Sequence, residues 1–214
     1  MGTKVGIIGS GVVGQTLAKG FVKHGYDVTI GSNDQKKRDE LKSKINANVG
    51  SFEDTAKSAA IVVLAVKGSA AEAAVTSAGL ANLAGKTVID ATNPIADAPP
   101  VNGVLKFFTS LDDSLMERLQ KLAPEAHFVK AFSCVGNALM VNPDFKCVRP
   151  TMFICGNDER AKRDVSAIVD RFGFEVADMG TVEAARAIEP LCMLWCIPGF
   201  QHNSWTHAFK LLKP

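Results

Sequence analysis

Residues 5–14 read Val5-Gly6-Ile7-Ile8-Gly9-Ser10-Gly11-Val12-Val13-Gly14. A short apolar run leads into three glycines with the spacing Gly-x-Gly-x-x-Gly, and the apolar positions over residues 12–24 recur with the period of a helix. A strand that passes through such a turn into a helix is the context in which this motif binds a dinucleotide. Gly9 permits the tight turn, Gly11 leaves room for the pyrophosphate, and Gly14 lets the helix pack closely on the strand. The candidate cofactor contacts here are Gly9, Ser10, Gly11, Val12, Val13 and Gly14.

The rest of the chain continues the alternation of strand and helix. Patterns typical of strands recur at 27–30, 61–66, 86–91, 128–132, 152–155 and 174–176, and helical patterns lie at 34–45, 70–78 and 158–172. This alternation predicts an α/β fold of Rossmann type, with a doubly wound, mostly parallel sheet covered by helices on both faces. From residue 181 the pattern turns helical, with a break expected at Pro198-Gly199. We expect a Rossmann domain over 1–180 and a small C-terminal helical extension over 181–214 packed on it.

The end of the second strand indicates which dinucleotide is bound. The sequence there is Gly31-Ser32-Asn33-Asp34-Gln35-Lys36-Lys37-Arg38, without the carboxylate that NAD-preferring sites place against the ribose 2′-OH. Two small donors, Ser32 and Asn33, are followed by three cations, a set that suits a 2′-phosphate dianion. The alternative is a solvated, basic start of a helix. The missing acid and the added cations both favour NADP(H), so we expect residues 1–180 to bind NADP(H).

Composition excludes several classes of protein. Lys and Arg number 24 against 22 Asp and Glu, a net charge of +2, so we expect neither a nucleic-acid partner nor a membrane surface. No run of 18 apolar residues predicts a membrane span, and the expected location is the cytoplasm. The five cysteines include no Cys-x-x-Cys, and the four histidines lack the spacing of metal ligands, so no metal site is expected.

Other candidates lie where the predicted strands end, because open α/β sheets bind ligands at the carboxyl ends of their strands. Ala65 and Val66 follow the most apolar strand. Lys130 is expected to be buried in a strand, either as a site residue or as the partner of a carboxylate such as Asp90. Cys134 is a candidate neighbour of the nicotinamide, with a small buried thiol as the alternative. The irregular stretch 93–110 is expected to cover the site as a lid.

Several stretches resemble the deazaflavin-dependent NADP oxidoreductase family, and the cytosolic reductase domain of STEAP-type ferric reductases is similar at the same places. The resemblance runs from residue 3 to residue 197. The stretches that carry it are 7–14 with Gly31-Ser32-Asn33, Asp90-Ala91-Thr92-Asn93-Pro94, Lys130-Ala131-Phe132, Asp178-Met179-Gly180-Thr181 and Ala185-Arg186-Ala187-Ile188-Glu189.

The resemblance implies a cytoplasmic homodimer that moves hydride between NADP(H) and a deazaflavin (coenzyme F420) or a flavin. It places Ser32, Asn33 and Lys37 on the 2′-phosphate, and Thr92, Asn93 and Pro94 near the nicotinamide. The chain departs from the family at Asn33, where Arg is common, and at Ser133-Cys134, where Asn-Thr is frequent. The first departure is expected to reduce affinity for NADP, and the second leaves the identity of the acceptor open.

Two other functions remain open at this point. One is an NADPH-dependent reductase of a small imine or carbonyl compound, which needs a proton donor beside the substrate. The other is a non-catalytic protein that senses NADP(H). We assign no catalytic residue from the sequence. Trp195 is expected either to form an aromatic wall of the acceptor pocket or to lie in a dimer interface.

Overall fold

The first strand lies inside a sheet, with further strands paired on both sides of it. The computed structural model describes residues 2–212, in which eight strands pair in the order β3-β2-β1-β4-β5-β6-β7-β8. All neighbours are parallel except β6 and β7. This arrangement confirms the predicted Rossmann-type fold. The strands are β1 (Lys4–Ile8), β2 (Asp27–Gly31), β3 (Asn48–Gly50), β4 (Ile61–Leu64), β5 (Thr87–Asp90), β6 (His127–Lys130), β7 (Thr151–Gly156) and β8 (Glu175–Asp178).

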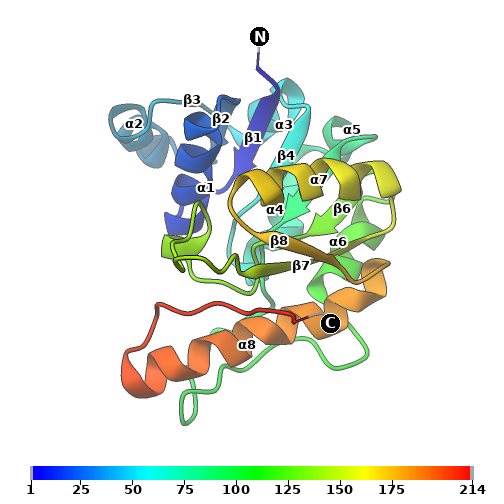
Figure 1. Cartoon of the computed structure of the whole chain (residues 1–214). Helices are drawn as coiled ribbons and strands as arrows, with labels where there is room; N and C mark the ends of the chain where they lie inside the picture. Colours follow the sequence, from blue (N-terminus) through cyan, green and yellow to red (C-terminus); the bar gives the residue numbers. More distant parts are fainter. Residues whose placement is uncertain (1, 213–214) are drawn as a thin grey trace.

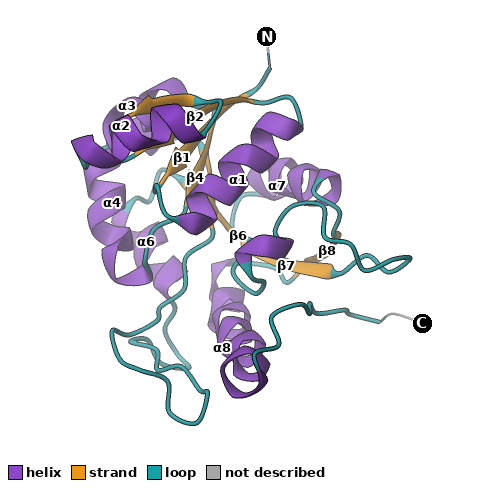
Figure 2. Cartoon of the chain, turned by 90° about the vertical axis from the view of Figure 1, so that its left-hand side faces the viewer, coloured by secondary structure: helices purple, strands orange, loops and turns teal. Residues whose placement is uncertain are grey.

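Helices cover both faces of the sheet, as Figures 1 and 2 show. They are α1 (Val12–Lys23), α2 (Gln35–Lys44), α3 (Phe52–Ser58), α4 (Ala71–Ala78), α5 (Leu80–Leu83), α6 (Leu115–Leu122), α7 (Glu159–Arg171) and α8 (Ala185–His202), with short 3₁₀ turns η1 (Gly68–Ala70), η2 (Asn137–Leu139) and η3 (Val182–Ala184). Side chains of α1, α2 and α7 contribute to one hydrophobic core, and side chains of α3 to α6 contribute to the other. Successive strand residues alternate between the two cores: Ile7 and Val63 belong to the first, Ile8 and Leu64 to the second. The middle residues of these strands are therefore mostly apolar, as parallel strands buried on both faces require.

The strands that follow β1 in the chain extend the sheet in two directions. The strands β2 and β3 lie on one side of β1, and β4 to β8 lie on the other. In open α/β sheets this change of direction opens a crevice at the carboxyl ends of the strands. Figure 1 shows α8 and the green chain between β5 and α6 beneath this edge, opposite the N-terminus. The carboxyl edge of the sheet is thus covered by α8 and by the segment between β5 and α6.

One strand and three helices were not predicted. They are β3, α3, α5 and α6, which are 3, 7, 4 and 8 residues long. The strand predicted over 61–66 is also shorter and ends at Leu64.

The predicted break at Pro198-Gly199 is wrong, because α8 continues to His202. Residues 203–212 then return along the helix without regular secondary structure (Figure 1). A Cβ on Gly199 would lie 2.2 Å from the ring of Trp205, so this glycine makes room for the returning chain. Trp195 donates its indole N–H to the carbonyl of His207 over 2.7 Å, and the amide of Thr151 donates to the carbonyl of Phe209 over 2.8 Å. Residues 181–212 therefore contain the turn η3, one long helix and a returning segment without regular secondary structure.

The segment between β5 and α6 is irregular, as predicted for 93–110. It forms isolated bridges between Ile95 and Phe107 and between Val101 and Val104. Its tip contacts α8, where the side chain of Gln201 donates to the carbonyl of Asn102 over 2.9 Å. Figure 2 shows this segment hanging beside α8. Among the described residues, no helix combines the length and apolar character of a membrane span.

Candidate functional site

In the turn after β1, neighbouring backbone atoms leave no room for a side chain at two of the three glycines. Gly9 has a φ of +127°, and a Cβ there would lie 2.2 Å from the carbonyl oxygen of Ala65. A Cβ on Gly14 would lie 2.0 Å from the carbonyl oxygen of Gly9. Any side chain at either position collides with backbone, so the fold itself requires both glycines.

Gly11 is different, because none of the described residues requires a glycine there. Its φ of −73° is accessible to every residue, and a Cβ would meet no atom within 4 Å. The space above Gly11 lies at the first turn of α1, which has no side-chain cap and no acidic residue. The free N–H groups and positive end of the helix suit a phosphate group. The turn therefore fits the pyrophosphate of a dinucleotide in both shape and charge.

The turn after β2 gathers the residues predicted for the 2′-phosphate. Ser32 is buried, and its hydroxyl accepts a hydrogen bond from the amide of Asp34. The side-chain oxygen of Asn33 accepts from the amide of Phe52 at the start of α3, over 3.2 Å. Lys37 is exposed in the first turn of α2, whose N-cap is Asp34.

Arg38 was grouped with the cations in the sequence but not singled out. Its guanidinium donates to the carbonyl of Ser32 over 2.6 Å, so this side chain folds back over the turn after β2. Side chains in the first turns of a helix point toward its N-terminus, and this direction could have favoured Arg38 over its neighbours. Arg38 therefore joins Lys37 as a candidate for the 2′-phosphate.

A cleft of about 530 Å³ lies at the carboxyl ends of β4 and β5. Four predicted residues line it together: Val13, Val66, Thr92 and Asn93. The sequence did not single out the others, which are Lys67, Gly68, Ala91, Ile95, Ala96, Asp97, Ala98 and Pro99. Most of these come from the segment between β5 and α6, which forms one wall of the cleft. Ala65, Pro94 and Cys134 are buried and do not line it.

Among the described residues, the only titratable groups that line the cleft lie at its rim. Lys67 and Asp97 form an ion pair of 2.9 Å, with side chains 77% and 72% exposed. An exposed pair of this kind contributes little stability. The rest of the lining is small, apolar or uncharged.

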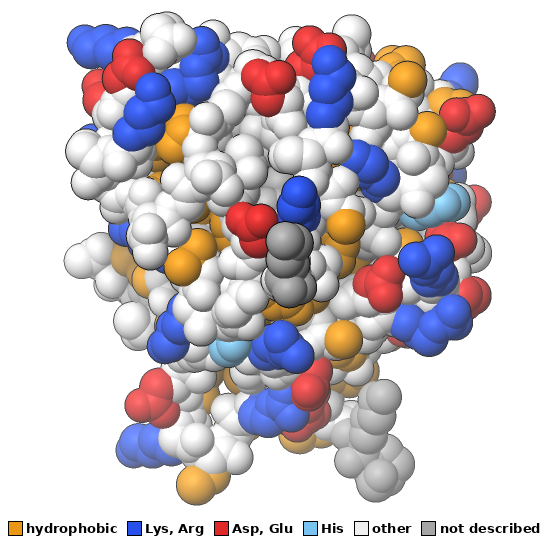
Figure 3. All heavy atoms as spheres, turned by 90° about the horizontal axis from the view of Figure 1, so that it is seen from above, with side chains coloured by type: hydrophobic (Ala, Val, Ile, Leu, Met, Phe, Trp, Pro, Cys, Tyr) orange, Lys and Arg blue, Asp and Glu red, His pale blue; other side chains and the backbone are white. Residues whose placement is uncertain are grey.

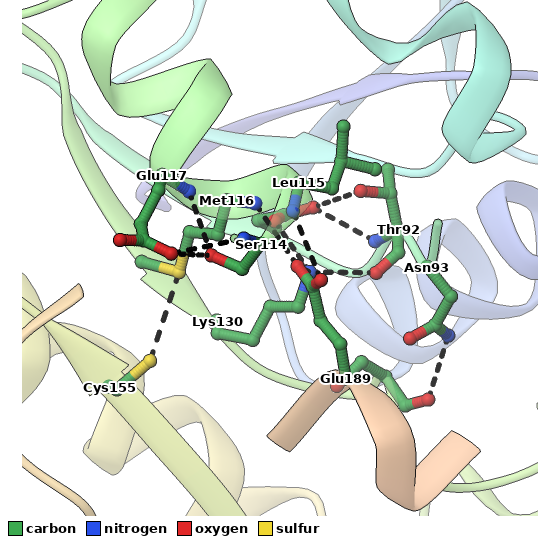
Figure 4. Close-up of polar contacts among 11 residues, drawn as sticks. Thr92, Asn93, Ser114, Leu115, Met116, Glu117, Lys130, Cys155 and Glu189 are labelled. Carbon is green, nitrogen blue, oxygen red and sulfur yellow. Dashed lines mark hydrogen bonds and ion pairs between the residues drawn. The ribbon is translucent and has the colours of Figure 1, made fainter. Parts of the chain in front are cut away.

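A buried network of charges lies beneath the cleft (Figure 4). The ammonium of Lys130 lies 2.8 Å from a carboxylate oxygen of Asp90 and 2.9 Å from one of Glu189, and all three side chains are 2% exposed or less. Lys130 also donates to the carbonyl of Thr92 over 2.8 Å. Of the two alternatives given for Lys130, the structure therefore has the second, in which this lysine is the buried partner of a carboxylate.

Electrostatics keeps Lys130 charged. Burial alone lowers the pKa of its ammonium, but the charges of Asp90 and Glu189 outweigh burial and raise the pKa above its ordinary value. Glu189 is further stabilised by the start of α6, since its carboxylate accepts from the amides of Leu115 and Met116 over 3.0 and 3.1 Å.

The chain after β6 is buried and is joined to the cleft wall through Asn93. Phe132 is buried with a φ of +62°, an unusual conformation for a large side chain. The Asn93 amide donates to the carbonyl of Ser133 over 2.8 Å, which ties the ends of β5 and β6 together. Within residues 2–212, the Asn93 side-chain oxygen and the Ser133 hydroxyl are buried without a hydrogen-bond partner.

Cys134 lies next in the chain and is 2% exposed. Burial raises the pKa of its thiol to about 11, so it is neutral at physiological pH. Trp195 does not line the cleft. Its ring lies over Gly136 and stacks on His207 of the tail with centroids 4.9 Å apart.

Another hollow, of about 430 Å³, lies at the opposite edge of the sheet, where β4, β5 and β6 begin. It contains His127 and Asp158, and the ring Nδ1 of His127 lies 3.8 Å from a carboxylate oxygen of Asp158. Figure 3 views this edge and shows cations and anions interspersed over the surface. The glycine turn opens at the other edge, so we place the candidate site in the carboxyl-edge cleft. In the described part of the chain, no group of three His, Cys, Asp or Glu side chains is arranged to hold a metal ion.

Comparison with known proteins gives consistent results along the chain. Residues 4–94 match the family described as NADP oxidoreductase, coenzyme F420-dependent. The structure superposes with a TM-score of 0.92 on a protein from Arthrobacter sp. assigned as an F420-dependent NADP reductase. The two are 31% identical, and the alignment covers 99% of this chain and 100% of that protein.

Two further proteins are similar to most of this chain. A hypothetical protein from Sinorhizobium meliloti is 26% identical with a TM-score of 0.74, over 100% of this chain and 97% of that one. Metalloreductase STEAP3 from Rattus norvegicus is 32% identical over 201 residues, which is 91% of this chain. The matched region spans 38% of the length of that metalloreductase.

Proposed function

The chain belongs to the family of coenzyme F420-dependent NADP oxidoreductases, and from this premise we propose that it transfers hydride between NADP(H) and a deazaflavin (coenzyme F420) or a flavin. Family membership rests on the full-length likeness to the Arthrobacter protein and on the family match over residues 4–94. The observation that carries the choice of reaction is the lining of the cleft, whose titratable groups are a single exposed ion pair at the rim.

We assign NADP(H) to the residues gathered around the glycine turn and the cleft. The pyrophosphate is held by Gly9, Ser10, Gly11, Val12, Val13 and Gly14. The 2′-phosphate is held by Ser32, Asn33 and Lys37, with Arg38 beside them. The nicotinamide lies against Val66, Thr92 and Asn93, while Ala65, Pro94 and Cys134 form a buried layer behind.

The lining favours transfer between two rings over reduction of a carbonyl or imine. When bound, the nicotinamide and the deazaflavin or flavin supply the electronic chemistry of hydride transfer. The protein then has to position both rings and exclude water. A carbonyl or imine substrate would also require a proton donor at the reacting atom. In this cleft Lys67 and Asp97 pair with each other at the rim, and the remaining lining carries no acid or base.

The experiment is an acceptor screen with purified protein. NADPH oxidation is measured with coenzyme F420, FMN and FAD, and separately with a cyclic imine and a small ketone. We expect turnover with coenzyme F420 or a flavin and none with the imine or ketone. Turnover with the imine or ketone alone would support the carbonyl or imine reductase. Tight NADPH binding without turnover on any acceptor would support the sensor.

We also propose that two copies associate through α8. Its partly exposed Met193 and Ile197 and its exposed Phe200 recur at the spacing of one helix face, and Leu194 beside them is 55% exposed. Val101 and Leu111, in the neighbouring segment between β5 and α6, are 73% and 82% exposed. An apolar face of this kind is typical of a protein interface.

A further inference from the structure

Lys130 and Asp90 are paired by the sheet itself. They are the last residues of β6 and β5, and the parallel register places them directly side by side. Their side chains therefore leave the sheet on the same face, at the edge where the cleft opens. Both side chains are fully buried, so neither touches a molecule in the cleft.

Asp90 and Lys130 form hydrogen bonds with all three polar groups of Thr92, which are its amide, its hydroxyl and its carbonyl. Its amide and its hydroxyl donate to the same oxygen of Asp90, over 2.9 and 2.6 Å. Its carbonyl accepts from the ammonium of Lys130 over 2.8 Å. Thr92 and the next residue, Asn93, both line the cleft. The position of this part of the cleft wall is thus set by two charged side chains behind it.

Glu189 connects the same ammonium to the helices that surround the site. It comes from α8, contacts Lys130 over 2.9 Å, and accepts from the first two amides of α6. Figure 4 shows the end of the Lys130 side chain meeting the Glu189 carboxylate and the carbonyl of Thr92. One cation therefore fixes the cleft wall relative to both α6 and α8.

Stability alone is a weak reason for such a network. Buried ion pairs are often no more stabilising than apolar side chains of similar volume, because taking charges out of water is costly. Apolar residues at these positions could hold the helices together. They could not orient the amide and carbonyl of Thr92, since this requires an acceptor and a donor at fixed points.

We infer that Lys130, with Asp90 and Glu189, acts as a positioning residue that holds the Thr92–Asn93 wall of the cleft in the geometry needed for hydride transfer. The inference rests on the proposed function, because it assigns the nicotinamide to this wall. The network binds neither the cofactor nor the acceptor itself. It acts through the backbone of Thr92.

The test compares Lys130→Met with Lys162→Met as a matched control. Lys162 is also a buried lysine with two carboxylate partners, Glu159 and Asp178, but it lies on α7 outside the cleft lining. Hydrogen exchange at the Thr92 and Asn93 amides is measured in the cofactor-free proteins, together with thermal unfolding, NADPH affinity, and kcat with the acceptor that the wild type reduces.

For Lys130→Met we expect faster exchange at Thr92 and a fall in kcat of about ten- to a hundredfold, because small displacements of positioning groups are costly to rate. NADPH affinity should change by less than about fivefold, since most contacts assigned to the dinucleotide lie elsewhere. Lys162→Met should lower the unfolding temperature and leave kcat and the Thr92 exchange as in the wild type.

The inference is overturned if both variants lose stability while both keep kcat and Thr92 protection, because the network would then be structural only. Should Lys130→Met fail to fold, Asp90→Asn replaces it. That change retains an oxygen that can accept from Thr92 but removes the charge that holds Lys130, and unchanged exchange and kcat in it would equally overturn the inference. Failure of the proposed function is a separate result, because the wild type would then bind no NADPH or reduce no acceptor.

Discussion

Gly11 occupies the first turn of α1 with open space where its side chain would be, whereas Gly9 and Gly14 are needed by the backbone around them. The same motif thus contains glycines of two kinds. Two are required for folding, and the third leaves open space at the first turn of α1. This difference gives a direct test of where the dinucleotide binds.

We predict that Gly11→Val abolishes NADPH binding and leaves the protein folded, because the added methyl groups occupy the proposed place of the pyrophosphate. Gly14→Val is the control, since its Cβ would lie 2.0 Å from the carbonyl of Gly9 and must disturb the turn itself. The measurements are NADPH fluorescence titration and circular dichroism. Retained NADPH affinity in a folded Gly11→Val protein would place the cofactor elsewhere.

Coenzyme preference is expected to depend on the cations after β2. Because each charge-assisted contact contributes about 1.5–3 kcal/mol, we predict that NADPH binds about ten- to a hundredfold more tightly than NADH. Lys37→Glu and Arg38→Glu should each reduce this ratio, chiefly by weakening NADPH. Lys36→Glu, a charge change at a neighbouring exposed lysine, serves as the control. Equal affinity of the wild type for both coenzymes would contradict the assignment of this turn.

At the scale of elements, α6 is joined to α8 by Arg186 and Glu117. The guanidinium makes a two-pronged contact with the carboxylate, with the shortest distance 2.6 Å, and Glu117 also completes a capping box with Ser114. The hydrogen bond from Arg186 outweighs partial burial and holds the pKa of Glu117 below its ordinary value of 4.5.

This lowered pKa gives a pH dependence with a definite sign. A carboxyl whose folded pKa is depressed contributes stability above its unfolded pKa and loses it as the pH falls through the folded value. We predict that Glu117→Gln lowers the free energy of unfolding by about 0.5–1 kcal/mol at pH 7, and that the difference from wild type shrinks below pH 4.5. Urea denaturation at several pH values measures it, with Glu53→Gln, from an exposed pair on α3, as the control. A difference independent of pH would contradict the charge-based account.

The elements that could be predicted are those with a long or strongly apolar pattern, such as α1, α7 and β4. The elements β3, α3 and α5 were missed because so few residues show no clear period. Helix α6 was missed although its apolar residues Leu115, Met116 and Leu119 recur at helical spacing. A local signal was nevertheless present for α6, since Ser114 and Glu117 have the spacing of a capping box, and for α3, where Ser51 caps the amide of Asp54.

The candidate site was likewise predicted only in part from the sequence. The glycine turn and the residues at strand ends follow from local sequence, because parallel strands bring their carboxyl ends to one edge. The Lys130–Asp90 pair was one of two alternatives for a lysine inside a strand. Its link to Glu189 was not foreseen, because the sequence does not show which face of α8 turns inward. The wall from Ile95 to Pro99 was expected only as an irregular lid.

At the scale of the whole molecule, the proposed pairing of two copies through α8 makes a testable prediction. Phe200→Glu and Leu194→Glu should convert a dimer to a monomer, because a charge cannot be buried in an apolar interface without a partner. Leu80→Glu, at a 42% exposed leucine on α5, should leave the mass unchanged. Sedimentation or light scattering measures the mass. A wild-type protein that is monomeric at all accessible concentrations would contradict this pairing.

Helix α8 presents Glu189 to the buried network beneath the cleft and Leu194 and Phe200 to the outside. If the partner copy covers the outer face, the position of α8 depends on the partner, and through Glu189 so does the position of Lys130. Specific activity should then vary with enzyme concentration: dilution past the dissociation constant of the dimer lowers the rate per subunit. The same dilution should leave the rate of an already monomeric Phe200→Glu variant constant.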